Sequence, residues 1–141
     1  MTAIAPPVVT LLFAAALGLV NMWLAFRAGV LRMKGKALVG DGGDPLMMAR
    51  MRAHANFNEY VPIALILMAL IELVGGRANA LWLFGSVLVV ARLLHPYGME
   101  RPAPNPLRMI GILLTYVVTL GLIGYAVWLL FHPPGSGAAY F

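Results

Sequence analysis

The chain has 141 residues, of which 62% are hydrophobic and 11% are charged, and its formal net charge is +5. A single soluble domain of this length cannot bury that much apolar surface, and disordered chains are poor in apolar residues, so both classes are excluded. Cysteine is absent, which excludes disulfides, thiolate metal sites and cysteine nucleophiles. The composition predicts a protein whose apolar exterior faces lipid and whose basic residues set its orientation and contact headgroups rather than nucleic acid.

Four apolar segments of the chain predict four membrane-spanning helices. Residues 8–26 and 109–131 carry no charge, and each is close to the roughly 20 residues that a helix needs to cross the hydrocarbon layer. The two segments between them carry charges near their ends, and glycine and proline residues separate all four. The sequence therefore predicts an all-α integral membrane protein, an up-down bundle of four transmembrane helices that forms one domain over residues 1–141. Its helices are expected at about 8–34, 46–73, 78–97 and 107–131.

Basic residues gather at one end of these helices. Four crossings place the first and third loops on the same side of the membrane. The basic residues of that side are Arg27, Arg32, Lys34, Lys36, Arg50, Arg52, Arg92, Arg101 and Arg108, whereas Arg77 alone lies on the other side. This asymmetry predicts cytoplasmic first and third loops and extracytoplasmic termini. We interpret Arg27 and the lysines as anchors at the membrane surface and Arg50 as a headgroup contact. The shortness and apolar content of the chain favour a bacterial inner membrane.

The second helix carries polar residues that a lipid-facing span would not tolerate. Arg52, Asn56 and Glu59 are spaced at i, i+4 and i+7, so they share one helical face, and Tyr60 lies beside them. A charged side chain within a bilayer costs about 2.5–3.5 kcal/mol on insertion scales. This face must therefore line a polar cavity enclosed by protein, unless Arg52 and Glu59 form an ion pair within the helix or across to another helix.

Further polar residues lie at the same side of the membrane and can converge on this face. Arg92 and His95 are three residues apart near the end of the third helix, Arg108 opens the fourth helix, and Arg32 lies near the end of the first. Arginine pairs with carboxylates through two parallel hydrogen bonds, and Glu59 can receive an ammonium group. These residue types indicate a zwitterionic ligand that carries carboxylates. The histidines lie on separate elements without ligand spacing, so we predict no metal site.

The segment from Arg52 to Pro62, with the sequence RAHANFNEYVP, resembles the RAHxNxxEYxP signature of the MAPEG family, the membrane-associated proteins in eicosanoid and glutathione metabolism. The similarity extends over nearly the whole chain. Arg92 and His95 form the R-x-x-H pattern of the third helix, and Arg32 matches an arginine of the first. Arg108 matches the arginine that opens the fourth helix in the family's synthases. The chain is therefore identified as a member of the bacterial type.

This resemblance implies a homotrimer of four-helix subunits that holds glutathione between neighbouring subunits near the cytosolic side. The residues it assigns to glutathione are Arg52, Asn56, Glu59 and Tyr60 of the second helix, Arg92 and His95 of the third, and Arg32 of an adjacent subunit. Arg108 would lie beside the sulfur as the catalytic residue. The family's synthases often place serine or tyrosine soon after that arginine. Met109 and Ile112 follow it here, which favours general glutathione chemistry over eicosanoid synthesis.

The expected function is that of a detoxifying, glutathione-dependent transferase or peroxidase. Its partners would be glutathione as cosubstrate, a lipophilic electrophile or hydroperoxide from the bilayer, membrane lipids and other copies of itself. A cation near a thiol in a low-dielectric pocket favours the thiolate, and Arg108 would supply that charge.

Two alternatives stay open. The first is a small proton-coupled transporter that exchanges protons at Glu59 for a lipophilic cation. The second is a membrane trimer that binds glutathione without catalysis. The position of Glu59, about two helical turns beyond Arg52 near the cytosolic entrance, favours an enzyme over a transporter, and so do the arginines nearby, which would repel a cation.

Overall fold

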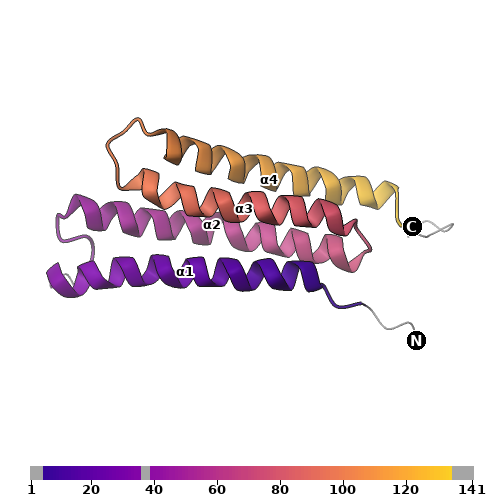
Figure 1. The fold of residues 1–141 in the computed structure, drawn as a ribbon, viewed down its shortest axis with the longest axis horizontal. Coiled ribbons are helices and arrows are strands. Elements are labelled where there is room, and N and C mark those ends of the chain that lie inside the picture. The colour runs from indigo at the N-terminus through magenta and orange to yellow at the C-terminus, as the bar shows by residue number, and fades with distance from the viewer. Residues whose placement is uncertain (1–4, 36–38, 135–141) are drawn as a thin grey trace.

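The fold is a bundle of four long α-helices. The computed structural model describes residues 5–35 and 39–134. The helices are α1 (Val8–Gly35), α2 (Pro45–Leu73), α3 (Ala78–Met99) and α4 (Pro106–Phe131). They lie side by side and alternate in direction, so the α1–α2 and α3–α4 connections lie at one end and the α2–α3 connection at the other (Figure 1). All four are long and apolar enough to cross a membrane, which confirms the predicted up-down transmembrane bundle.

Side-chain caps and prolines define where α2 and α4 begin. Asp44 accepts a hydrogen bond from the backbone nitrogen of Leu46 at 2.9 Å, and Asn105 accepts one from Leu107 at 3.0 Å. A proline follows each cap at the first helical position, where its missing N–H leaves no hydrogen bond unmade. The Asn105 cap fixes the start of α4 two residues before Arg108, the residue with the predicted catalytic role.

Apolar side chains fill the centre of the bundle and also cover its outside. The largest fully buried apolar side chains are Leu17, Met47, Met68, Ile71, Leu81, Leu88, Val118 and Leu122. On the outer face of α1, Leu19 is 75% exposed and Phe26 is 69% exposed. An exterior of this kind is costly in water and favourable in lipid, as the composition predicts.

Glu72 joins α2 to the start of α1 at the end of the bundle that holds the α2–α3 connection. Its two carboxylate oxygens accept hydrogen bonds from the backbone nitrogens of Val9, at 2.8 Å, and Thr10, at 2.7 Å. The first turn of α1 contains no acidic residue of its own, and its N–H groups have no partner within the helix. The Glu72 carboxylate from the neighbouring α2 accepts hydrogen bonds from two of these N–H groups. Its negative charge also interacts favourably with the positive end of the α1 dipole.

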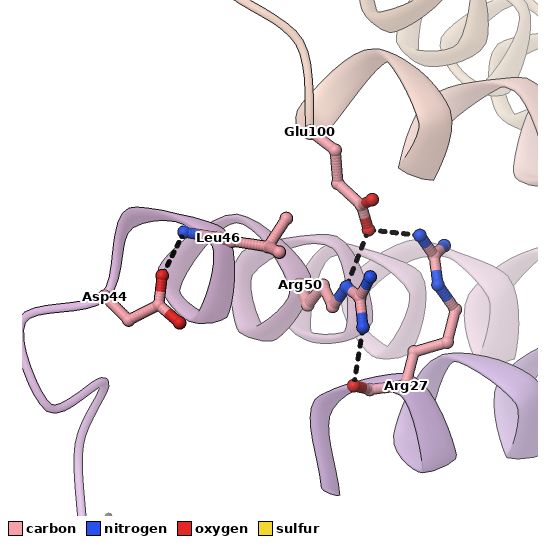
Figure 2. Close-up of polar contacts among 5 residues, drawn as sticks. All are labelled: Arg27, Asp44, Leu46, Arg50 and Glu100. Carbon is pink, nitrogen blue, oxygen red and sulfur yellow. Dashed lines mark hydrogen bonds and ion pairs between the residues drawn. The ribbon is translucent and has the colours of Figure 1, made fainter. Parts of the chain in front are cut away.

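Glu100, directly after α3, joins the first three helices at the opposite end. One of its carboxylate oxygens pairs with Arg27 of α1 and, at 2.9 Å, with Arg50 of α2 (Figure 2). Arg50 also donates to the backbone carbonyl of Arg27 at 3.1 Å, and the Arg27 guanidinium lies 4.5 Å from the ring centre of Trp23. We refer to Arg27, Arg50 and Glu100 as the Glu100 cluster.

The Glu100 cluster corrects two interpretations made from the sequence. Arg27 was expected to anchor the chain at the membrane surface, and Arg50 was expected to contact headgroups. Both pair with a carboxylate of the protein instead, because the end of α3 brings Glu100 against α1 and α2. Lys36, another of the expected anchors, lies outside the described residues. The cytoplasmic orientation of this end stays a prediction.

Candidate functional site

A cavity of about 240 Å³ lies between α2, α3 and α4, where these helices approach the end that holds the α3–α4 connection. Five of the residues predicted for the site line it, namely Arg52, Asn56, Glu59, His95 and Arg108. The spacing of the α2 residues therefore does place them on one face of a helix, and that face borders an open space. The cavity brings two guanidinium groups, a carboxylate, a carboxamide and an imidazole together.

The charged side chains of the cavity are not paired with each other. In residues 5–35 and 39–134, the ion pairs are those that join Glu100 to Arg27 and Arg50. Within the same ranges, the side chains of Arg52, Glu59 and Arg108 make no hydrogen bond or ion pair. The alternative in which Arg52 and Glu59 neutralise each other is therefore not the arrangement of this chain. Their charges are available to a ligand.

Arg92 lies behind the cavity and orients one of its residues. Its side chain is almost fully buried, at 1% exposure. One guanidinium nitrogen donates to Asn56 Oδ1 at 2.9 Å, and another donates to Thr115 Oγ1 at 2.6 Å. Because this hydrogen bond occupies the side-chain oxygen of Asn56, its Nδ2 remains available as a donor. Arg92 therefore shapes the site through Asn56 rather than by lining it.

Tyr60 contributes to the site through a second tyrosine that the sequence analysis missed. Tyr116 of α4 lines the cavity, and its hydroxyl lies 3.2 Å from the hydroxyl of Tyr60. A signal for Tyr116 was present in the sequence, because Arg108, Ile112 and Tyr116 are four residues apart and share one helical face. Ala55, Met99 and Ile112 complete the lining.

Two glycines allow α3 and α4 to approach closely beside the cavity. A Cβ atom at Gly98 would collide with the backbone nitrogen of Arg108, and one at Gly111 would lie 2.8 Å from the Cβ of His95. His95 is only 4% exposed, so α4 covers most of it. The two glycines thus set how close the backbone of Arg108 lies to the last turns of α3.

Arg32 does not line the cavity. Its described hydrogen bond also does not reach a residue that lines the cavity, in contrast to those of Tyr60 and Arg92. Its guanidinium lies 3.6 Å from the sulfur of Met51. The residues around the cavity come from α2, α3 and α4, whereas Arg32 belongs to α1. Its expected contribution from an adjacent subunit stays a prediction.

The fold and the cavity together define a small helical membrane protein with a polar site suited to a ligand that carries carboxylates. The chain matches the sequence profile of the MAPEG family over residues 10–128, and it belongs to this family, as its signature predicts. It is 36% identical over 92 residues to the inner membrane protein YecN of Escherichia coli strain K12 and of Escherichia coli O6:H1, a match that covers 65% of this chain and 70% of each relative. With its four spanning helices, it is an integral inner membrane protein.

Proposed function

We propose that this protein is a glutathione-dependent transferase or peroxidase that acts on lipophilic electrophiles or hydroperoxides. The observation that carries the proposal is the cavity, where Arg52, Glu59 and Arg108 border one space without pairing to a described residue. A charged group within a bilayer costs about 2.5–3.5 kcal/mol, so three such groups need a polar ligand or a protein partner. Membership of the MAPEG family supports a function related to glutathione in general.

The charges of glutathione match the groups that line the cavity. The tripeptide carries two carboxylates and one ammonium group. Arg52 can hold a carboxylate through two parallel hydrogen bonds, and Asn56 Nδ2 adds a neutral donor. Glu59 can receive the ammonium group. His95 and Tyr60 border the tripeptide from α3 and α2, and Arg32 completes the site from an adjacent copy of the chain in a homotrimer.

Arg108 has a different role because it acts on the sulfur. A thiol is mostly protonated at neutral pH, and a nearby cation in a low-dielectric pocket favours the thiolate, which is the nucleophile. Arginine keeps its charge under these conditions, so Arg108 stabilises the thiolate without giving up a proton. The carboxylate that Arg52 holds fixes the sulfur in position. The thiolate then attacks an electrophile that arrives from the bilayer.

A proton-coupled transporter is the second candidate, and the position of Glu59 does not argue against it as the sequence suggested. Glu59 lies 14 residues from either end of α2, which runs from Pro45 to Leu73, and so occupies the middle of the helix rather than its entrance. The argument against a transported cation is the lining itself. Arg52 and Arg108 face the same cavity as Glu59 and would repel a cation.

The variant Arg108→Ala tests the proposal in the purified protein in detergent, with glutathione and chlorodinitrobenzene as substrates. We expect kcat to fall about 10²-fold, as for the loss of one preorganised group that stabilises charge, while the Kd of glutathione rises less than about threefold. Arg101→Ala is the matched control, because Arg101 is an exposed arginine outside the cavity.

Each other outcome has a definite meaning. An unchanged kcat in Arg108→Ala would remove Arg108 from the mechanism. Retention of glutathione without turnover of chlorodinitrobenzene or of a lipid hydroperoxide would favour the binding trimer. Failure to bind glutathione at all would contradict the proposed function.

A further inference from the structure

Tyr116 shares the cavity with Arg108 but lies further along the same helix. The two residues are eight positions apart, so about 12 Å of helix axis separates their Cα atoms. Long side chains on a helix lean toward its N-terminus, which directs Tyr116 back toward Arg108. A molecule in the cavity can therefore meet the guanidinium at one end and the phenol at the other.

The hydroxyl of Tyr116 has a partner that leaves its proton available. It lies 3.2 Å from the hydroxyl of Tyr60, and a phenol can donate one hydrogen bond while accepting another. When Tyr60 donates to Tyr116, the proton of Tyr116 is free for an acceptor in the cavity that Tyr116 lines. The buried guanidinium of Arg92 is bonded to Thr115, the residue before Tyr116, and to Asn56, four residues before Tyr60. A cation and a donated hydrogen bond both stabilise the phenolate that remains after proton transfer.

The surroundings of Tyr116 also fit an apolar substrate. On either side of it on α4, Leu113 is 55% exposed and Val117 is 63% exposed, so the outer surface of the helix around Tyr116 is apolar. Arg52 and Arg108 lie at the other side of the cavity, toward the α3–α4 connection. A lipophilic molecule that approaches α4 from the bilayer can therefore reach Tyr116.

From this geometry we propose that Tyr116 is a catalytic proton donor for the reduction of lipophilic hydroperoxides. The proposal rests on the proposed function and adds a catalytic residue to its peroxidase reaction. The thiolate sulfur attacks the terminal oxygen of the hydroperoxide, a sulfur–oxygen bond forms, and the oxygen–oxygen bond breaks. The electron pair of that bond leaves on the alkoxide, and Tyr116 protonates the alkoxide to give the alcohol.

The remaining steps restore the site. The Tyr116 phenolate takes up the proton that a second glutathione releases when its thiol ionises. The thiolate of that glutathione attacks the sulfur of the sulfenic acid, a disulfide forms and hydroxide leaves. The hydroxide takes the proton that the first glutathione released when its thiol ionised, which gives water. The sulfur atoms lose two electrons in all, and the hydroperoxide gains two, so the reaction needs no other oxidant or reductant.

The experiment compares two substrates whose leaving groups differ in their need for a proton. An alkoxide is a poor leaving group unless it is protonated, whereas chloride leaves chlorodinitrobenzene as a stable anion. In Tyr116→Phe we expect kcat with cumene hydroperoxide to fall about 10²-fold, the size usual for a general acid. The loss with hydroperoxide should exceed the loss with chlorodinitrobenzene at least tenfold. Tyr97→Phe is the matched control, because Tyr97 is an exposed tyrosine on α3 outside the cavity.

A second variant and the pattern of results keep the test decisive. Tyr60→Phe retains the proton of Tyr116 but removes its hydrogen-bond partner, and should give a smaller loss that is again selective for hydroperoxide. Equal losses with both substrates in Tyr116→Phe, or no loss with either, would overturn the role of Tyr116 and leave the proposed function standing. No turnover of either substrate by the unmodified protein would overturn both.

Discussion

Asn56 has one side-chain group available at the cavity, its Nδ2, because Arg92 donates a hydrogen bond to its Oδ1. The guanidinium of Arg92 reaches Asn56 and Thr115 at once, with separations of 2.9 Å and 2.6 Å, and is shielded from lipid and solvent. Thr115 in turn donates to the carbonyl of Gly111 at 2.8 Å. This chain of hydrogen bonds connects α2, α3 and α4 directly behind the cavity, so the orientation of the Asn56 amide depends on residues that do not line the cavity.

Glu59 provides the negative charge of the cavity, and Glu59→Gln tests what that charge binds. Glutamine has nearly the same shape and still accepts a hydrogen bond, so the variant removes only the attraction to an ammonium group. We expect the Kd of glutathione, measured by calorimetry in detergent, to rise about tenfold, equivalent to roughly 1.4 kcal/mol.

The matched control for this prediction is a ligand rather than a protein variant. A glutathione analogue whose ammonium group is replaced by hydrogen should bind the unmodified protein and Glu59→Gln with the same affinity. If glutathione binds both forms equally, Glu59 does not contact the ammonium group. If Glu59→Gln weakens the binding of the analogue as much as it weakens the binding of glutathione, the substitution acts on the cavity as a whole.

The predicted placement of residues on a shared face is confirmed where a single helix decides it. The i, i+4 and i+7 spacing placed Arg52, Asn56 and Glu59 on one face without knowledge of any other helix. The pairing of Arg27 and Arg50 with Glu100 was missed because it depends on how three helices meet, and the spacing along each helix contains no such information.

Between elements, the close contact of α3 and α4 depends on glycine. Gly98 faces the backbone of Arg108, and Gly111 faces His95 and the carbonyl of Ala91. Neither contact could be predicted from the sequence, because a glycine inside an apolar helix is compatible with a close approach, a kink or neither. The helices themselves follow from apolar runs and caps, but the distance between them is set by which side chains are missing at the contact.

Gly98→Ala tests whether this contact positions Arg108. The added methyl group would meet the backbone of α4, which cannot move aside as a flexible side chain can, so α4 must shift. We expect a loss of about 1–3 kcal/mol of stability, the usual cost of overpacking, and a fall in kcat with chlorodinitrobenzene. The measurements are the thermal unfolding midpoint in detergent and steady-state kinetics.

Gly124→Ala is the control for Gly98→Ala on the same α4 helix. No atom lies within 4 Å of the position that its Cβ would take, and alanine is the better helix former by about 0.5–1 kcal/mol. The control should therefore keep full activity and unfold at the same temperature or higher. If Gly98→Ala behaved in the same way, the glycine contact would not determine the position of Arg108.

At the scale of the whole molecule, the charged cavity lies on a surface that is otherwise apolar. Arg52, Glu59 and Arg108 are all exposed in the isolated chain, and Ile63, Ile66 and Leu70 continue the same face of α2 with exposures of 52–56%. Charged groups at such a surface are unstable against lipid, and cover by another protein chain removes that cost. This is the physical reason to expect an adjacent copy of the chain against the site.

A shared site predicts that two inactive variants restore activity when they assemble together. Arg32→Ala and Arg108→Ala should each have low kcat with chlorodinitrobenzene when expressed alone. In a ring of mixed subunits, a site receives an intact Arg32 from the Arg108→Ala chain and an intact Arg108 from the Arg32→Ala chain. Each mixed trimer should have both intact arginines in about a third of its sites, because every heterologous interface of a closed ring is equivalent.

The measurement is the specific activity of co-expressed protein that is purified through one tag on each variant, so that only mixed oligomers are collected. Mixing the two variants after separate purification, under conditions in which subunits do not exchange, is the control and should restore nothing. If co-expressed protein stays as inactive as the separate variants, Arg32 acts within its own chain or not at all. Because neither variant chain carries both arginines, recovered activity would require that one copy completes the site of another.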